Sequence, residues 1–403
     1  MTPTPQPKLR RVLSLPWLVF YGVGVTVGAG IFALIGEIIG VAGDHAPWSF
    51  AVAGVVAGFT AFSYAALSAA FPRAAGEAVY VKHGIGAAAG RLTGYALLVT
   101  ALMSSAVISL AFARYLSSFS GIPEWAALIG VIGLLAGVAI TGVKESVAAA
   151  ALVTLLEVGT LLVVIGVGLP ASVDSGALWS VLAPPVNAIQ WSGVLEGTFL
   201  AFFAFIGFQN IVNMAEETED AARAIPRAVV LTLVISIAIY ALAAGVAASY
   251  PERDALVASK APLAVLFEGV TGRPGSVIAV MASIAMVNGI LVQIVMASRV
   301  LYGMANEGML PSFFARLHPS RQTPHAAILV FSCAAMLLSL AVPLMELAES
   351  TSLVILIVFA LVNLSLFLIG RRPDAPHALR RARWTGLLGT LATLGLILAE
   401  LAA

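Results

Sequence analysis

The sequence predicts an all-α integral membrane protein with about eleven transmembrane helices. Of its 403 residues, 60% are hydrophobic and 10% are charged, whereas soluble domains carry about 25% charged residues. The mean hydropathy is +1.02. Eleven apolar runs reach the length of about 20 residues that a helix needs to cross a bilayer.

The expected spans follow one another along a single membrane domain, 1–403, without a soluble domain. In chain order they are residues 16–42, 48–70, 92–118, 124–142, 146–169, 191–214, 228–250, 276–300, 326–344, 348–370 and 384–402. The first run exceeds the h-region of a signal peptide, so we expect it to stay in the mature protein. We expect segment 76–90, which is amphipathic and glycine-rich, on the cytoplasmic surface. Loops 170–190 and 251–275 are the longest connections.

The basic residues predict the orientation. With the N-terminus in the cytoplasm, only Arg114, Arg253, Lys260 and Arg273, of 21 lysines and arginines, fall in outer segments. Cytoplasmic loops of membrane proteins carry such an excess of basic residues. We therefore expect a multi-pass protein of the cell (inner or plasma) membrane with a cytoplasmic N-terminus.

Several functional classes are disfavoured by what the sequence lacks. Cys333 is the single cysteine, which excludes an intramolecular disulfide and a cysteine metal cluster. No nucleotide motif indicates an ATP-driven pump, and the net charge of +1 does not indicate nucleic-acid binding. We expect no cofactor and no metal. We find neither a cluster of catalytic residue types, as a membrane enzyme needs, nor the continuous polar face of a channel.

The order of the spans indicates internal symmetry. Residues 16–169 and 191–370 are candidate five-helix repeats, and 384–402 is an extra peripheral helix. Because five crossings is an odd number, the two repeats must lie inverted in the membrane. Inverted repeats with broken helices at matching positions are typical of secondary transporters, so the first span of each repeat is the place to look for a break.

The first span is weakened by glycine near its middle. Gly22, Gly24, Gly28 and Gly30 lie within nine residues, and each costs about 1 kcal/mol relative to alanine in a helix interior. An unwound stretch would free peptide groups that lipid cannot satisfy, and a helix N-terminus there would suit a carboxylate. The alternative is close helix packing through the Gly24 and Gly28 pair.

The sixth span has a matching irregularity. Gly207 lies mid-span, after a phenylalanine cluster and before Gln209, Asn210 and Asn213. The aromatic side chains could form a lid and walls for an apolar ligand group, or they could be core packing. The equivalent position of the first and sixth spans in the two repeats favours a break in both.

Three stretches of the chain resemble the amino acid–polyamine–organocation (APC) superfamily of permeases, which have a LeuT-like five-plus-five fold. The first stretch is Gly28-Ala-Gly30-Ile-Phe32 in the first span. The second runs from Phe203 through Gly207 to Ala215-Glu216-Glu217 and Ile225-Pro226-Arg227-Ala228. The third is Ser298-Arg299-Val-Leu-Tyr302, followed by Gly308-Met-Leu-Pro311 and Thr323-Pro324. The stretches occur in the family's order and spacing over the first ten spans. The resemblance implies a secondary active transporter that carries amino acids by alternating access, and not an enzyme.

The resemblance also implies a substrate site at the two breaks. It puts the substrate carboxylate at the break in the first span and the amino group and side chain at the sixth, with Phe203 as an aromatic gate. The residues concerned are Thr26, Gly28, Ala29 and Gly30 for the carboxylate, and Phe203, Phe205, Ile206 and Gly207 for the rest. Gly24 and Val27 match the first-span side of the site that holds sodium in sodium-coupled relatives.

Glu157, in the fifth span, is the most informative single residue. A carboxylate at mid-membrane costs about 2.5–3.5 kcal/mol on insertion scales. Proton-coupled or ion-independent relatives often carry a lysine thirteen residues after a Lys-Glu-Ser motif, and here Lys144-Glu145-Ser146 precedes Glu157. The hypothesis is a proton or cation coupling site, in which Glu157 pairs with Ser298 or with the backbone of the first span. The alternative is a neutral, structural carboxyl.

Other polar residues have weaker indications. Glu216, Glu217 and Arg299 form either an inner gate or a solvated helix end, while Ser104 and Ser105 fall at pocket depth. Glu37 and Arg114 are expected to reach the outer interface, Asn288 to bridge helices, and Gln209 to have no acid-sensing role.

The expected substrate is an amino acid with a neutral, small-to-medium apolar side chain, because Glu157 is the one acidic residue at central depth. A polyamine or organic cation carrier and an amino acid exchanger of the same fold stay open as alternatives. The expected partners are the substrate, the lipid bilayer and a proton as coupling ion, in a monomer or a weak homo-oligomer.

Overall fold

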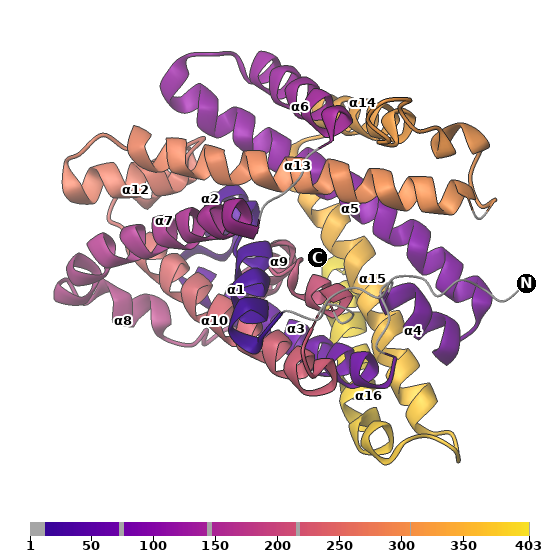
Figure 1. Cartoon of the computed structure of the whole chain (residues 1–403). Helices are drawn as coiled ribbons and strands as arrows, with labels where there is room; N and C mark the ends of the chain where they lie inside the picture. Colours follow the sequence, from indigo (N-terminus) through magenta and orange to yellow (C-terminus); the bar gives the residue numbers. More distant parts are fainter. Residues whose placement is uncertain (1–12, 72–75, 143–146, 215–217, 307, 403) are drawn as a thin grey trace, which may run out of the picture.

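The computed structural model describes residues 13–71, 76–142, 147–214, 218–306 and 308–402, and Figure 1 shows their arrangement. Within these ranges every regular secondary-structure element is a helix, and the sole β-type pairing is an isolated bridge between Leu13 and Thr218. The all-α membrane fold expected from composition is therefore confirmed.

Each expected span corresponds to a helix or a pair of helices. Span 1 is α1 (Leu15–Thr26) with α2 (Ala29–Ala42), and the others are α3 (Ala46–Ala70), α5 (Ala87–Ser120), α6 (Glu124–Thr141), α7 (Val147–Asp174), α9 (Ala188–Ala204), α10 (Ala221–Ala248), α13 (Ser276–Asn306), α14 (His325–Ala341), α15 (Leu344–Gly370) and α16 (His377–Leu401). By length and composition alone, nine stretches of the described residues could cross a membrane. One of them, Ala29–Ala70, contains both α2 and α3, while α1 and α14 are shorter apolar helices.

Short helices fill the connections. They are α4 (Gly76–Gly84), α8 (Ala177–Leu182), α11 (Arg253–Val257), α12 (Pro262–Thr271) and the 3-10 turns η1 (Gly43–His45), η2 (Phe208–Met214) and η3 (Ser312–Ala315). The expected surface segment 76–90 ends earlier than its pattern indicated. Gly86 has φ +146°, a conformation that other residues rarely adopt, so α4 stops before it and the third span begins at Ala87 rather than at residue 92.

Span 1 and span 6, which we define as α9 with η2, lie in the middle of the molecule (Figure 1). α1 packs against α7, α10 and η2, and α2 packs against α9 and α5. On one side α13 packs along α5, and on the other α15 packs along α16. The two spans with irregular backbone are therefore enclosed by protein, as unpaired peptide groups inside a membrane require.

Candidate functional site

Span 1 is broken at mid-length. α1 ends at Thr26, Val27 and Gly28 leave the helical conformation, and α2 starts at Ala29. The first N–H groups of a helix lack partners within it, and no side chain caps this end of α2 in the described part of the chain. The expected break is confirmed, and it exposes donor groups at the start of α2.

Span 6 is broken at the same level of the fold. α9 ends at Ala204, the next three residues form a turn, and η2 starts at Phe208. Gly207 lies in the turn with φ +141°, which a residue with a side chain rarely adopts. The expected second break is confirmed, and glycine is required at its tightest point.

The two breaks touch each other directly. A Cβ atom on Gly207 would lie 2.5 Å from the carbonyl oxygen of Val25, and a Cβ atom on Gly30 would lie 2.8 Å from Cα of Ala204. Both contacts are with backbone atoms, which cannot rotate away. These two glycines therefore let the backbones of spans 1 and 6 approach each other.

Close packing explains most of the other glycines of span 1. A Cβ on Gly24 would lie 2.0 Å from Oγ1 of Thr154, and one on Gly22 would lie 2.4 Å from Oγ1 of Thr232. Gly28 differs, because a Cβ there would meet nothing nearer than 3.8 Å, the carbonyl oxygen of Val25. Helix packing thus accounts for Gly22, Gly24 and Gly30, but it does not account for Gly28.

Tyr240, on α10, joins the two breaks. Its buried hydroxyl lies 2.6 Å from the carbonyl oxygen of Thr26 and 2.8 Å from that of Ala204, in hydrogen-bonding geometry to both. These carbonyls end α1 and α9. Tyr240 was not among the expected site residues, although the sequence holds a signal. Thr232, Ser236 and Tyr240 are spaced by four residues and form a buried polar stripe in the apolar part of α10.

Gln209 stabilises the break in span 6. Its side-chain oxygen accepts a hydrogen bond from the N–H of Gly207 at 2.8 Å, and the residue is buried. The amide satisfies a peptide group that the turn removes from the helix. The sequence had indicated only that this position lacks an acid, so this role was missed.

The aromatic residues expected at the site pack around the breaks. Phe203 is buried, with Cδ1 3.4 Å from the Cβ position of Gly30, and the Phe205 ring centroid lies 5.1 Å from that of Tyr240. Ile206 is partly buried. Thr26 is 2% exposed, and its hydroxyl has no hydrogen-bond partner among the described residues. The site thus has apolar walls and an unused hydroxyl.

Glu157 lies on α7 beside span 1. It is 4% exposed, one turn after the Thr154 side chain that contacts Gly24, and it is close enough to Tyr240 for the two groups to interact electrostatically. In the described ranges Glu157 makes no ion pair. Ser298 donates its hydroxyl proton to the carbonyl of Val295 at 2.9 Å, so its pairing with Glu157 stays a prediction. Val27 is buried at the break.

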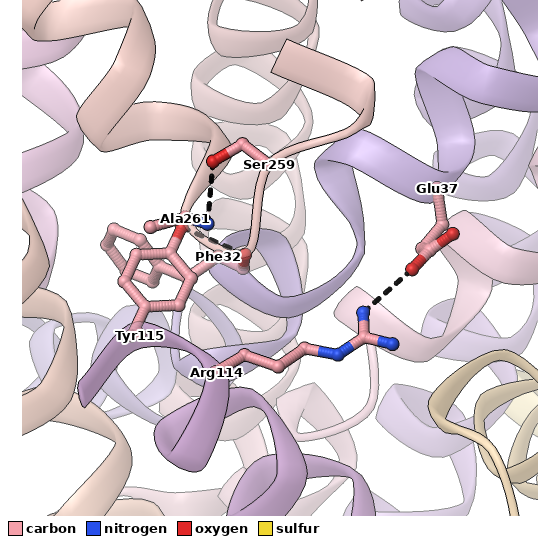
Figure 2. Close-up of polar contacts among 6 residues, drawn as sticks. All are labelled: Phe32, Glu37, Arg114, Tyr115, Ser259 and Ala261. Atoms are coloured by element: carbon pink, nitrogen blue, oxygen red, sulfur yellow. Dashed lines mark hydrogen bonds and ion pairs between the residues drawn. The ribbon is translucent and has the colours of Figure 1, made fainter. Parts of the chain in front are cut away.

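Arg114 and Glu37, both expected to reach the interface, form an ion pair with each other. Nη1 of Arg114 lies 2.9 Å from Oε1 of Glu37 (Figure 2). On the same helix, the Tyr115 hydroxyl donates to the carbonyl of Phe32 at 3.1 Å (Figure 2). α2, the second half of span 1, is therefore attached to α5.

Of the remaining polar candidates, some are buried between helices and others lie outside the described residues. Ser104 accepts a hydrogen bond from Nε2 of Gln293 at 3.2 Å, which links α5 to α13, and Ser105 is fully buried. Glu216, Glu217 and the Lys144-Glu145-Ser146 motif lie outside the described residues. In the part of the chain that the structure describes, no group of three or more His, Cys, Asp or Glu side chains could hold a metal.

Two apolar spans interrupted at mid-length, with their broken ends in contact inside a helical bundle, are typical of secondary transporters. A family model for amino acid permeases matches residues 12–402, so the chain belongs to the amino acid permease family. It is a multi-span amino acid transporter and not an enzyme.

Its relatives are transporters from bacteria and plants. An uncharacterized transporter of Mycobacterium tuberculosis is 32% identical over 386 residues, which cover 95% of this chain and 85% of that protein. The branched-chain amino acid permease BcaP of Bacillus subtilis is 25% identical over 92% of this chain and 84% of its own. Cationic amino acid transporter 3, mitochondrial, of Arabidopsis thaliana is 27% identical over 90% of this chain and 63% of its own.

Proposed function

We propose that the chain is a secondary active transporter that binds one α-amino acid where the breaks of spans 1 and 6 meet and moves it by alternating access. The observation that carries the proposal is the opposed polarity of the broken ends. The N-terminus of α2 offers donors, and the C-termini of α1 and α9 offer carbonyl acceptors, side by side. A zwitterion presents the complementary pair of charges.

The carboxylate end of the site is the start of α2. A helix N-terminus carries about half a positive charge from the aligned peptide dipoles, and its free N–H groups bind anions. Gly28 leaves room beside Ala29 and Gly30, since a Cβ there would make only ordinary contacts, 3.8 Å from the carbonyl oxygen of Val25 and 3.9 Å from that of Gly24. The unpartnered hydroxyl of Thr26 adds a further polar group.

The ammonium end consists of the carbonyls of Thr26 and Ala204. Each terminates a half-helix, where the dipole places partial negative charge. Tyr240 alone hydrogen-bonds both carbonyls in the described structure, and a hydroxyl has a single proton to donate. The pair therefore retains capacity for a cationic amine.

The substrate side chain would lie against apolar walls. Phe203, Phe205 and Ile206 flank the span 6 break, so the proposal favours neutral amino acids with small-to-medium apolar side chains. The similarity to a branched-chain amino acid permease supports this choice. The cationic relatives support a second candidate, a basic amino acid or polyamine, because Glu157 lies within electrostatic reach of Tyr240.

Glu157 is the proposed coupling site. An acid buried on α7 beside the break, without an ion pair in the described ranges, is expected to bind a proton or a cation. Its position beside α1 lets protonation act on the same half-helix that holds the substrate. We extend the proposal to the five-plus-five inverted repeat, 16–169 and 191–370, and to a cytoplasmic N-terminus.

In the conformation described, the outer side of the site is covered. A Cβ on Gly36 of α2 would lie 2.8 Å from Cγ of Pro262, at the start of α12. Ion pairs join Arg253 to Asp44 and Lys260 to Glu124, and both attach this outer loop to neighbouring elements. Alternating access requires α11 and α12 to move away from α2.

Reconstitution in liposomes tests the proposal. Uptake of labelled L-leucine, L-alanine, L-arginine and putrescine should be measured with an inward proton gradient, an inward sodium gradient and neither, beside protein-free liposomes. We expect uptake of a neutral amino acid that rises with the proton gradient. Uptake of putrescine or arginine alone would select the second candidate, and no uptake or counterflow of any amino acid would overturn the proposed site.

A further inference from the structure

We infer that Tyr240 is a direct part of the amine subsite: its phenol oxygen is a third acceptor that makes the carrier select a protonated primary amine. The inference rests on the proposed function and deepens it. It assigns a substrate-contacting role to a residue of α10, outside the two broken spans.

The position of the hydroxyl is strongly constrained. Tyr240 is fully buried, and its ring lies between Phe50, at 5.5 Å between centroids, and Phe205, at 5.1 Å. Its oxygen lies 2.6 Å from the carbonyl oxygen of Thr26 and 2.8 Å from that of Ala204. The carbonyl oxygens that end α1 and α9 therefore both lie within hydrogen-bonding distance of the Tyr240 oxygen on α10.

The Tyr240 hydroxyl and the two carbonyls together have fewer protons to donate than positions that can accept a hydrogen bond. A phenol has one O–H proton and lone pairs on its oxygen, and each carbonyl oxygen can accept two hydrogen bonds. With one proton between them, the two carbonyls cannot both be fully bonded. A primary ammonium brings three donors, one for each carbonyl and one for the Tyr240 oxygen.

A purely structural role makes a different prediction. If Tyr240 only ties the end of α1 to the end of α9, its removal weakens the fold or slows turnover for every substrate alike. If its oxygen accepts a bond from the ammonium, its removal costs a primary amine one hydrogen bond and costs a ligand with fewer donors nothing. Selectivity between ligands separates the two roles, because a ratio cancels losses of folded protein.

The test compares Tyr240→Phe with Tyr115→Phe. Tyr115 is a matched control, since it is also a buried tyrosine whose hydroxyl donates to a carbonyl of span 1, that of Phe32, away from the breaks (Figure 2). Inhibition constants should be measured in proteoliposomes for L-leucine, N-methyl-L-leucine and 2-hydroxyisocaproate. N-Methylation removes one donor and adds bulk, whereas the hydroxy acid has a single donor and adds no bulk.

We expect Tyr240→Phe to lower the preference for leucine over both analogues by about tenfold to 100-fold, the value of one hydrogen bond to a charged group. Tyr115→Phe should keep the wild-type ratios. Unchanged ratios in Tyr240→Phe would overturn the inference and leave the proposed function standing. A fall limited to the N-methyl analogue would also overturn it, because added space would explain that result. If no amino acid competes in the wild-type protein, the proposed function itself fails.

Discussion

Replacing Gly207 with alanine should lower transport about 100-fold while the protein still inserts and folds. The glycine has φ +141° at the turn between α9 and η2, and its missing side chain faces the backbone of span 1. The new Cβ would lie 2.5 Å from the carbonyl oxygen of Val25, 2.9 Å from its carbonyl carbon and 3.1 Å from Cα of Thr26. All three are main-chain atoms, so a rotamer change cannot relieve the contact.

The magnitude follows from the distance. Ordinary contact begins at 3.4 Å, so the two breaks must separate by about 0.9 Å, and misplacement of binding groups by about 1 Å costs roughly 100-fold in rate. Overpacking of this kind costs about 1–3 kcal/mol of folding free energy, and the unfavourable backbone conformation adds about 1–3 kcal/mol. Transport should therefore fall about 100-fold, with a smaller loss of thermal stability.

The assay is initial uptake of labelled L-leucine, or of whichever amino acid the wild type carries best, into proteoliposomes. Recovery in the monodisperse peak of a size-exclusion column corrects each rate for folded protein. Gly133→Ala is the matched control, because a Cβ at Gly133 on α6 meets no atom within 4 Å, and alanine is the better helix former. Wild-type uptake by Gly207→Ala would refute the reasoning, since it would mean that the breaks need not touch.

Three further substitutions test the room beside Gly28, the coupling role of Glu157 and the buried carboxyl group of Glu77. Gly28→Ala should leave thermal stability unchanged and raise the KM for amino acid uptake, because its Cβ enters the space beside α2 rather than a packed interface; a lower melting temperature with unchanged KM would contradict this. Glu157→Gln should abolish the acceleration of uptake by a proton gradient and retain counterflow, and unchanged pH dependence of uptake would remove Glu157 from coupling. Burial raises the pKa of Glu77 on α4, against a smaller opposing effect of Tyr64, so the folded state holds this proton to higher pH than the unfolded chain does. Stability is then greatest below the unfolded pKa, about 4.5, and falls as pH rises through the folded pKa. Glu77→Gln should flatten a profile of melting temperature against pH and raise the melting temperature at pH 8, and a steeper profile would show that the carboxylate is stabilising.

The sequence determined the positions of the long apolar helices and the places where two of the expected spans break. Both are local properties: hydropathy sums over a window of about 20 residues, and glycine weakens a helix wherever it stands. The breaks at Thr26–Ala29 and Ala204–Phe208 accordingly fall where the glycine patterns predicted them. The start of the third span was misplaced because the positive φ of Gly86, which is not a hydropathy signal, decided the boundary.

The tertiary structure alone decided which residues meet at the breaks. Tyr240 is separated by 214 residues from Thr26, to whose carbonyl it is bonded, and no window along the chain contains both. The same holds for the Arg114 and Glu37 pair, 77 residues apart, whose contact with each other the sequence did not indicate.

The glycines of spans 1 and 6 show most clearly what the sequence determines and what only the tertiary structure decides. Composition cannot tell a glycine that allows helix packing from one that keeps a site open, because the missing side chain is the same in both. The difference lies in what a Cβ would meet: the backbone of another helix, too close, at Gly30 and Gly207, and only ordinary contacts at 3.8 Å or more at Gly28. Only the three-dimensional packing of spans 1 and 6 supplies those neighbours, since they come from chain segments far apart in the sequence.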